Sequence, residues 1–173
     1  LSDLNEKEVS VNVEPLILKD IKQTDSENVL ILGWNSAADY IINELNQYEG
    51  PNSEVMVASN SPEIHNRLKS GEFVMDNQVV KYISSDITDR SSLDKIDFDK
   101  YDHVIILSCN RSQREQADAN TLLTLIHVRD IAKKNNYSFS IVSEILDTKN
   151  RDLIANKKVD DFVASEKIIS FIL

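Results

Sequence analysis

Residues 29–39 constrain the fold of this chain most strongly, because an apolar, β-branched run passes through a glycine into a helical pattern. The run at 29–32 is typical of a buried strand, and Gly33 provides the tight bend that follows it. Residues 36–48 then repeat apolar side chains at the spacing of an amphipathic helix. A buried strand that turns directly into a helix opens a βαβ unit, so the sequence predicts a parallel sheet.

The bend keeps only one of the three glycines in the dinucleotide-binding pattern G-x-G-x-x-G. Gly33 holds the first position, Asn35 the second and Ala38 the third. The second glycine normally lets backbone amides approach a pyrophosphate at the helix N-terminus, and the Asn35 side chain crowds that approach. Ala38 still allows the helix to pack closely on the strand. The segment therefore predicts a Rossmann-type fold and argues against NAD in its usual pose.

The end of the second expected strand, at 54–58, also departs from an NAD site. An Asp or Glu there would hold the ribose hydroxyls. Ser59 follows the strand instead, and the next acid, Glu63, falls on the expected helix at 61–70. Binding of NAD in its usual pose is therefore less favoured than a turn that maintains the fold alone or binds another ligand.

Strand and helix patterns alternate along the chain. Strands are expected at 29–33, 54–58, 79–83, 103–108, 139–143 and 161–164. Helices are expected at 36–48, 61–70, 90–95, 114–134 and 148–156, and a last one begins at 166–173. This alternation predicts an α/β, Rossmann-like fold, with a doubly wound parallel six-stranded sheet and helices on both faces. We expect one domain over 28–173, preceded by a linker or docking lead-in at 1–27.

The long helix at 114–134 carries acids early and bases late, which suits the helix dipole. Its apolar residues recur at three- and four-residue spacing. The side chains expected to face the core are Ala119, Leu122, Leu123, Ile126 and Ile131.

Composition excludes several classes of partner. The net charge of −10 and an isoelectric point near 4.7, with no basic stripe, argue against binding nucleic acid. No run of about 18 apolar residues is present, so we expect no membrane span in these residues. The single cysteine, Cys109, fits a reducing compartment, which indicates the cytosol.

Six residues lie at the carboxyl ends of neighbouring expected strands, where open α/β sheets bind ligands. These candidate ligand-binding residues are Gly33, Asn35, Ser59, Asp86, Ser108 and Glu144. Asp86 is a nucleotide contact in one interpretation, and in the other Thr88 or Asp89 merely caps the next helix. Glu144 and Asp147 likewise mark either a site or a helix start with Asp147 as its cap.

Catalytic groups are hard to find in this sequence. It has no Tyr-x-x-x-Lys pair, no Gly-x-Ser-x-Gly elbow and no His-Glu-x-x-His helix. Cys109 is either a buried thiol or a reactive one whose pKa Arg111 and Arg114 lower. An aspartate-rich stretch from Asp97 lacks the Gly and Glu of a calcium-binding EF-hand loop. We expect no enzyme activity; the alternative is a soluble NAD(P)-binding oxidoreductase with a degenerate glycine fingerprint.

Three segments together resemble the Castor/Pollux family of ion channels. They are Gly33-Trp34-Asn35; Gln116-Ala117-Asp118 leading to Val128-Arg129-Asp130-Ile131; and Ser143-Glu144-Ile145-Leu146-Asp147 followed by Asp161-Phe162-Val163-Ala164-Ser165-Glu166. The similar part of that family is a cytosolic regulator-of-potassium-conductance (RCK, TrkA-N-like) domain, and this chain is expected to be the second of two.

The resemblance implies a ligand-sensing, gating-ring domain at the cytoplasmic face of a membrane, in a channel for potassium or another cation. It implies two kinds of partner, namely other RCK domains in a homo-oligomer and a membrane pore domain in the full-length chain. Related domains bind calcium or nucleotides, so the ligand class stays open between calcium and an adenine nucleotide, with NAD less favoured. Residues 166–173 would then begin the helix through which RCK domains pair.

Overall fold

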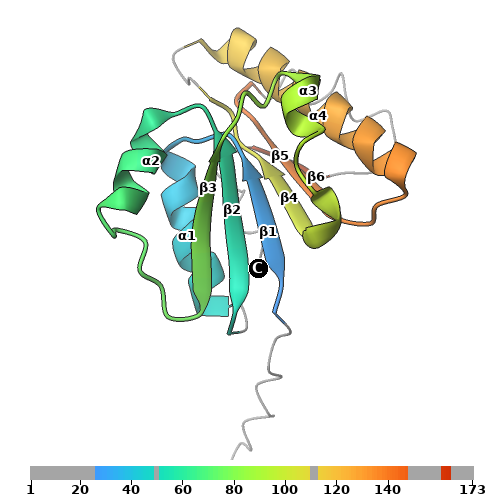
Figure 1. Cartoon of the computed structure of the whole chain (residues 1–173). Coiled ribbons are helices and arrows are strands. Elements are labelled where there is room, and N and C mark those ends of the chain that lie inside the picture. The colour runs from blue at the N-terminus through green and yellow to red at the C-terminus, as the bar shows by residue number, and fades with distance from the viewer. Residues whose placement is uncertain (1–25, 49–50, 110–112, 148–160, 165–173) are drawn as a thin grey trace, which may run out of the picture.

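Six parallel strands form one sheet in the computed structural model, which describes residues 26–48, 51–109, 113–147 and the backbone of 161–164. Their order across the sheet is β3-β2-β1-β4-β5-β6 (Figure 1). The strands are β1 (Asn28–Leu32), β2 (Ser53–Ser59), β3 (Gln78–Ser84), β4 (His103–Ile106), β5 (Ser140–Ile145) and β6 (Asp161–Ala164). The strand order reverses between β1 and β4, which is the switch point where doubly wound proteins bind ligands.

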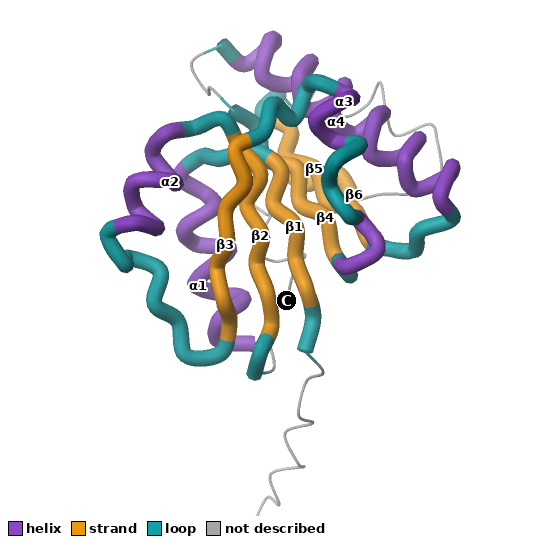
Figure 2. Tube along the Cα trace, in the orientation of Figure 1, coloured by secondary structure: helices purple, strands orange, loops and turns teal. Residues whose placement is uncertain are grey.

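Helices cover both faces of the sheet, as Figure 2 shows for the purple helices around the orange strands. On one face lie α1 (Ser36–Tyr48) and α2 (Pro62–Lys69), whose Ile41, Ile42 and Ile64 pack on β1 and β2. On the other lie α3 (Arg90–Leu93), the 3-10 turn η1 (Phe98–Lys100) and α4 (Arg114–Asn135), which bury Leu93 and Phe98 among others. The predicted α/β, Rossmann-like, doubly wound fold is therefore confirmed.

Three elements end two residues away from the predicted position, and the other described ends differ by one residue at most. The helix expected at 90–95 is a single turn, which begins at its Asp89 cap and buries only Leu93. The strand expected through residue 108 stops at Ile106, where its pairing with β1 ends. The strand expected at 139–143 instead runs to Ile145, because its last residues pair with β6. The helices expected at 148–156 and 166–173, and residues 1–25 of the lead-in, lie outside the described residues.

The buried face of α4 is not the one that its apolar pattern predicted. Leu123 and Ile126 are 41% and 61% exposed, and Ala119 is exposed too, so the expected core stripe is wrong for these three. Leu122 is half-buried, and only Ile131 of the five expected residues is buried. The helix instead turns a mixed face to the sheet, and Thr124 explains part of this choice because its hydroxyl donates to Ile87 O at 3.0 Å. The side chains buried along α4 are Ala117, Asp118, Thr121, Thr124, Leu125, Val128 and Ile131.

None of the helices in the described ranges combines the length and the apolarity that crossing a bilayer requires.

Candidate functional site

The turn between β1 and α1 is fixed by contact with the neighbouring strand. Gly33 has φ +97°, and its amide donates to Ala58 O at 2.9 Å. A Cβ at this position would lie 2.6 Å from Leu107 O and 2.9 Å from Cys109 Sγ. Both the backbone conformation and the close approach therefore require glycine. The fold alone accounts for Gly33, as one interpretation of the sequence allowed.

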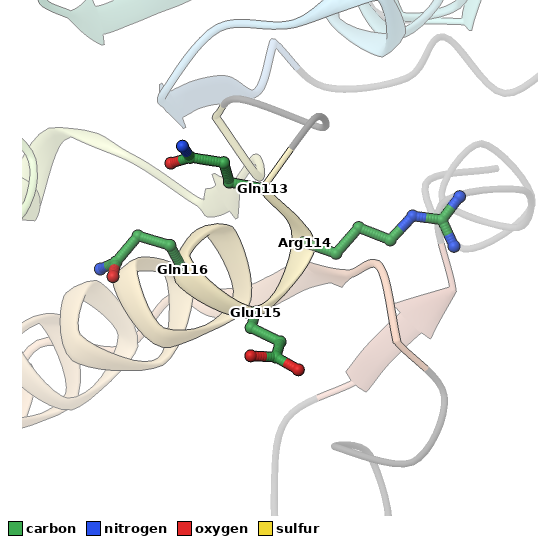
Figure 3. Close-up of a pocket in the computed structure, with 4 residues that line it drawn as sticks. All are labelled: Gln113, Arg114, Glu115 and Gln116. Atoms are coloured by element: carbon green, nitrogen blue, oxygen red, sulfur yellow. The ribbon is translucent and has the colours of Figure 1, made fainter.

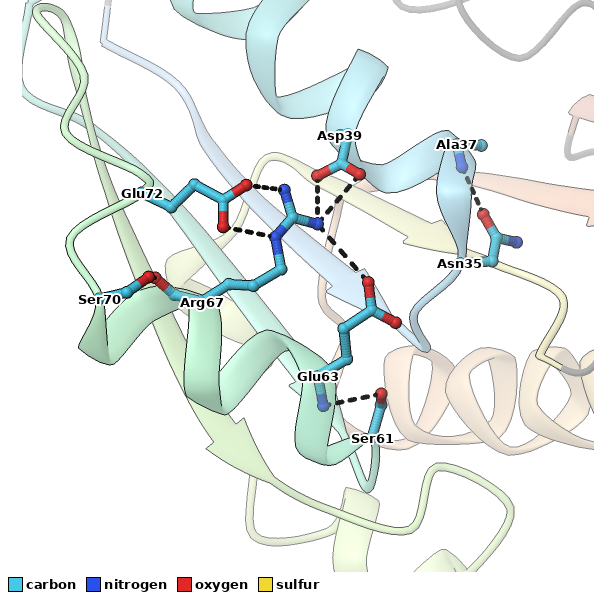
Figure 4. Close-up of polar contacts among 8 residues, drawn as sticks. All are labelled: Asn35, Ala37, Asp39, Ser61, Glu63, Arg67, Ser70 and Glu72. Carbon is cyan, nitrogen blue, oxygen red and sulfur yellow. Dashed lines mark hydrogen bonds and ion pairs between the residues drawn. The ribbon is translucent and has the colours of Figure 1, made fainter.

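Asn35 uses its side chain to satisfy the start of α1. Its Oδ1 accepts from Ala37 N at 2.8 Å (Figure 4), and its backbone oxygen accepts from Ala38 N at 3.0 Å. These are amides of the first helical turn, the donors that a bound phosphate takes in a dinucleotide site. The residue at the second glycine position thus supplies its own acceptor in place of a ligand.

The amide nitrogen of Asn35 ties this turn to the ends of two other strands. It donates to Ser108 O at 2.7 Å and to Glu144 Oε2 at 2.6 Å. Glu144 lies on β5 with no exposed surface, and the same oxygen accepts from Ser108 N at 2.9 Å. Three of the six predicted residues therefore meet, in a hydrogen-bonded network that closes the turn.

A cavity of about 190 Å³ opens on the other side of Gly33. It lies at the carboxyl ends of β2, β3 and β4, and α4 forms one wall. Gly33 borders it, because Ile87, Leu107 and Cys109 surround the Cβ position of this glycine and also line the cavity. The lining residues are Asn60, Asp86, Ile87, Thr88, Leu107, Cys109, Asn120 and Thr121.

Asp86 is the one predicted residue in the cavity wall. Its Oδ1 accepts from Thr88 N at 3.0 Å and from Thr88 Oγ1 at 2.7 Å. Asp89 caps α3 by accepting from the amides of Ser91 and Ser92, so capping and the cavity use different acids. The pKa of Asp89 is lowered because the hydroxyls and amides of those two serines stabilise its charged form.

Ser59 points elsewhere. It is buried at the end of β2, and its Oγ accepts from Ser61 N at 3.1 Å, so its hydroxyl shapes the β2–α2 turn. It does not line the cavity.

Cys109 lines the cavity, but its surroundings do not activate the thiol. Burial raises its pKa, and the charge of Glu144 raises it further, while a backbone hydrogen bond from Trp34 acts against both. The interpretation that arginines lower this pKa is therefore wrong as far as the described residues show; Arg111 lies outside them. A reactive thiolate at neutral pH does not follow from this geometry.

A second, open hollow lies at the start of α4. It is lined by Gln113, Arg114, Glu115 and Gln116, and Figure 3 shows Arg114 pointing to the opposite side from Gln113 and Gln116, with Glu115 pointing in a third direction. Nearby, Asp118 accepts from Leu146 N at 2.8 Å and from Asp147 N at 3.0 Å, which fixes the chain after β5. The helix that Asp147 was expected to cap lies outside the described residues. Because the side chains of this hollow diverge, we favour the cavity beside Gly33 as the site.

Sequence reasoning missed three polar residues of the cavity wall, Asn60, Asn120 and Thr121. Asn60 follows Ser59 directly, so its place at the end of β2 was a usable signal. Asn120 and Thr121 were missed because they lie in mid-helix, and only the observed rotation of α4 turns them toward the sheet edge. Among the described residues, no group of three or more His, Cys, Asp or Glu side chains is placed to hold a metal ion.

Comparison with known proteins identifies the domain. Residues 29–165 match the family model described as the TrkA-N domain. The chain is 24% identical over 182 residues to "Ion channel DMI1" of Medicago truncatula and 24% identical over 181 residues to "Ion channel CASTOR" of Lotus japonicus. Each alignment covers 85% of this chain but only 21% of the relative, so the chain spans about a fifth of these curated proteins.

A solved structure supports the fold independently. The X-ray structure of Pen from Bacillus thuringiensis superposes with a TM-score of 0.53 at 20% sequence identity, covering 72% of this chain and 38% of that one. The similarity to Castor/Pollux channels that the sequence motifs indicated is confirmed by the relatives. The chain belongs to the TrkA-N domain family.

Proposed function

We propose that this chain is a cytosolic, ligand-sensing domain of a cation channel, potassium or another cation being the ion, and that it works in a gating ring. The observation that carries the proposal is the match over residues 29–165 together with relatives that are named ion channels. The pore domain would lie in the rest of the full-length protein. The other partners would be further domains of the same fold, of which this one is the second in its subunit.

The cavity beside Gly33 is where we place the sensing step. Its walls come from the loops after β2, β3 and β4 and from α4, so a ligand there touches four separate parts of the chain. A ligand shifts a conformational equilibrium only as far as it binds one arrangement better than the other. A ligand that contacts both Asp86 and Asn120 would favour one position of α4 relative to the sheet. Opening or closing of the pore would be coupled to that position.

The runner-up function, an NAD(P)-dependent oxidoreductase, has less support. Its cofactor would need the first-turn amides of α1 for its pyrophosphate, and Asn35 already occupies two of them. The relatives named above are ion channels and not oxidoreductases.

The test uses the full-length protein that carries this chain, purified and reconstituted in liposomes. We expect cation flux that changes when a panel of calcium, adenosine, AMP, ADP, ATP, NAD⁺ and NADH is added from the side that exposes the domain. The same preparation is assayed for oxidation of NADH and NADPH. Absence of cation flux, or steady hydride transfer without flux, would contradict the proposal.

A further inference from the structure

We propose that the cavity beside Gly33 takes a small, phosphate-free ligand with N–H donors, of the nucleobase or nucleoside class, and rejects nucleotides and dinucleotides. This inference rests on the proposed sensing function and specifies the ligand of the same site. It extends the argument against NAD in its usual pose, because the turn does not fit a pyrophosphate.

The first argument is that the usual phosphate position is filled. Phosphates bind at the start of α1 through free backbone amides and the helix dipole. Here Asn35 Oδ1 and its backbone oxygen accept from Ala37 N and Ala38 N, so two of those donors are used. Glu144 Oε2 stands 2.6 Å behind the Asn35 amide. A phosphate is an acceptor and an anion, as the carboxylate is. This position disfavours a phosphate because its donors are already used and because the charge of Glu144 would repel it.

The second argument is the charge of the cavity itself. Of the lining residues that the structure describes, none is Lys, Arg or His, and one, Asp86, is an acid. A phosphate in a small cavity needs cations or converging amides to replace its hydration. The wall offers amide and hydroxyl side chains from Asn60, Asn120 and Thr121, which suit a neutral polar ligand instead.

The third argument is the shape and the pattern of acceptors. Ile87 and Leu107 are 8% and 1% exposed and give the cavity an apolar side on which a planar ring can lie. Asp86 is exposed at the cavity mouth, and its Oδ1 accepts from Thr88 N and Oγ1, which leaves Oδ2 without a partner among the described residues and open to solvent or a ligand. A carboxylate oxygen in this position accepts from ring or exocyclic N–H groups. The volume, about 190 Å³, is below the roughly 300–1,000 Å³ of sites for drug-sized molecules. It therefore suits a single ring system and not a dinucleotide.

Adenosine and AMP are the matched probes, because they differ only by the phosphate. Calorimetric titration of this chain should give a dissociation constant for adenosine at least tenfold lower than for AMP, and no measurable binding of NAD⁺. Asp86→Asn should weaken adenosine binding at least tenfold. The variant keeps an Oδ1 acceptor for Thr88 and should fold normally, which its melting temperature checks. The control is Asp76→Asn, an exposed acid at the other end of β3, which should leave binding unchanged.

A second readout locates the ligand. Because Cys109 lines the cavity, bound adenosine should slow alkylation of its thiol at least threefold, and AMP at the same concentration should not. Binding of AMP or NAD⁺ as tight as that of adenosine overturns the exclusion of phosphate. Binding of none of the three overturns the ligand class. In either case the liposome assay tests the proposed function independently of the ligand class. Cation flux that responds to calcium or another compound would still support that function.

Discussion

At the scale of single residues, Gly33 is required for two independent reasons. Its backbone has φ +97°, which side chains rarely adopt, and a Cβ there would lie 2.6 Å from the carbonyl oxygen of Leu107, just after β4. Gly33→Ala should therefore lower the free energy of unfolding by about 3 kcal/mol or more, combining backbone strain of about 1–2 kcal/mol with overlap of a similar size. Urea denaturation of the purified chain measures the change.

Gly71 separates the two causes. It also has positive φ, +75°, but a Cβ there would meet nothing within 4 Å. Gly71→Ala should cost only the strain, about 1 kcal/mol. Equal losses for the two variants would show that the contact with Leu107 O contributes nothing.

Asn35 allows a prediction whose sign depends on pH. Asn35→Asp keeps the acceptor for Ala37 N but places a second carboxylate against Glu144 Oε2, 2.6 Å from the present amide nitrogen. Two carboxylates this close share a proton, so the pKa of one is raised in the folded state. The folded variant then binds more protons than the unfolded chain, and its stability should rise as pH falls from 7 toward 5.

We expect Asn35→Asp to be destabilised by about 3 kcal/mol at pH 7 and to recover part of this loss at pH 5. Asn35→Ser, which keeps a cap without a charge, should lose about 1–2 kcal/mol at both values of pH. Thermal melts across that range measure both variants. A pH-independent loss in the aspartate variant would mean that Glu144 does not face it.

Residue positions at strand ends were predictable, but their bonding was not. Parallel topology brings Asn35, Ser108 and Glu144 to one edge, and the sequence pattern predicted this much. Both the oxygen and the nitrogen of the Asn35 side-chain amide form hydrogen bonds within the protein. These bonds depend on side-chain geometry across three strands, which no local sequence pattern encodes. The cavity wall contributed by Asn120 depends on how α4 is rotated, and apolar spacing predicted that rotation incorrectly.

At the scale of elements, one arginine joins α1, α2 and the glycine turn. Arg67 of α2 forms a bidentate pair with Glu72, at 2.6 and 2.8 Å, and its Nη1 lies 2.8 Å from Asp39 Oδ1 of α1 (Figure 4). Its guanidinium also lies over Phe73 and Trp34, with 4.8 and 5.6 Å to the ring centroids. This cluster explains the conspicuous tryptophan after Gly33, because the indole gives α2 a surface to pack on.

Arg67→Met should destabilise the chain by about 1–2 kcal/mol, since it keeps the aliphatic stem but loses the charge over two rings. Lys69→Met, at an exposed position of the same helix, should change stability by less than about 0.5 kcal/mol.

Arg67 also lowers the pKa of Glu72 through their hydrogen bond. The wild-type chain should therefore lose stability as pH falls below about 4.5, and Arg67→Met should lose less over that interval. Urea melts at pH 7 and pH 3.5 measure both effects.

The kinds and order of elements were predictable because each strand is a short β-branched run between turn residues. Their ends were less so. β5 runs through Ile145 because β6 pairs with it, and a pairing between segments far apart in sequence leaves no local signal. The prediction of the buried face of α4 was wrong for a related reason. Apolar residues lie on two faces of this helix, and the hydrogen bond to the loop at Ile87 selects the face that contains threonines.

At the scale of the whole molecule, the proposed gating ring needs a surface for a second domain of the same fold, and α4 offers one. Leu123 and Ile126 lie one helical turn apart on its outer side, and both are exposed. They do not line the cavity, so a partner can cover them while the site stays open. A chain with a net charge of −10 repels its copies, so association needs apolar contact of this kind to overcome the repulsion.

Sedimentation velocity of the chain at high micromolar concentration should show dimers or larger species, more of them as salt is raised, since salt screens the repulsion. Leu123→Lys combined with Ile126→Lys should shift the population to monomer with little change in melting temperature, because both side chains already face water. Val79→Lys is the control, an exposed apolar position on the edge strand β3 that is 55% accessible. If Val79→Lys dissociates the oligomer and the α4 pair does not, the ring contact runs through the sheet edge. A wild-type chain that stays monomeric throughout would place the ring contact in the rest of the full-length protein.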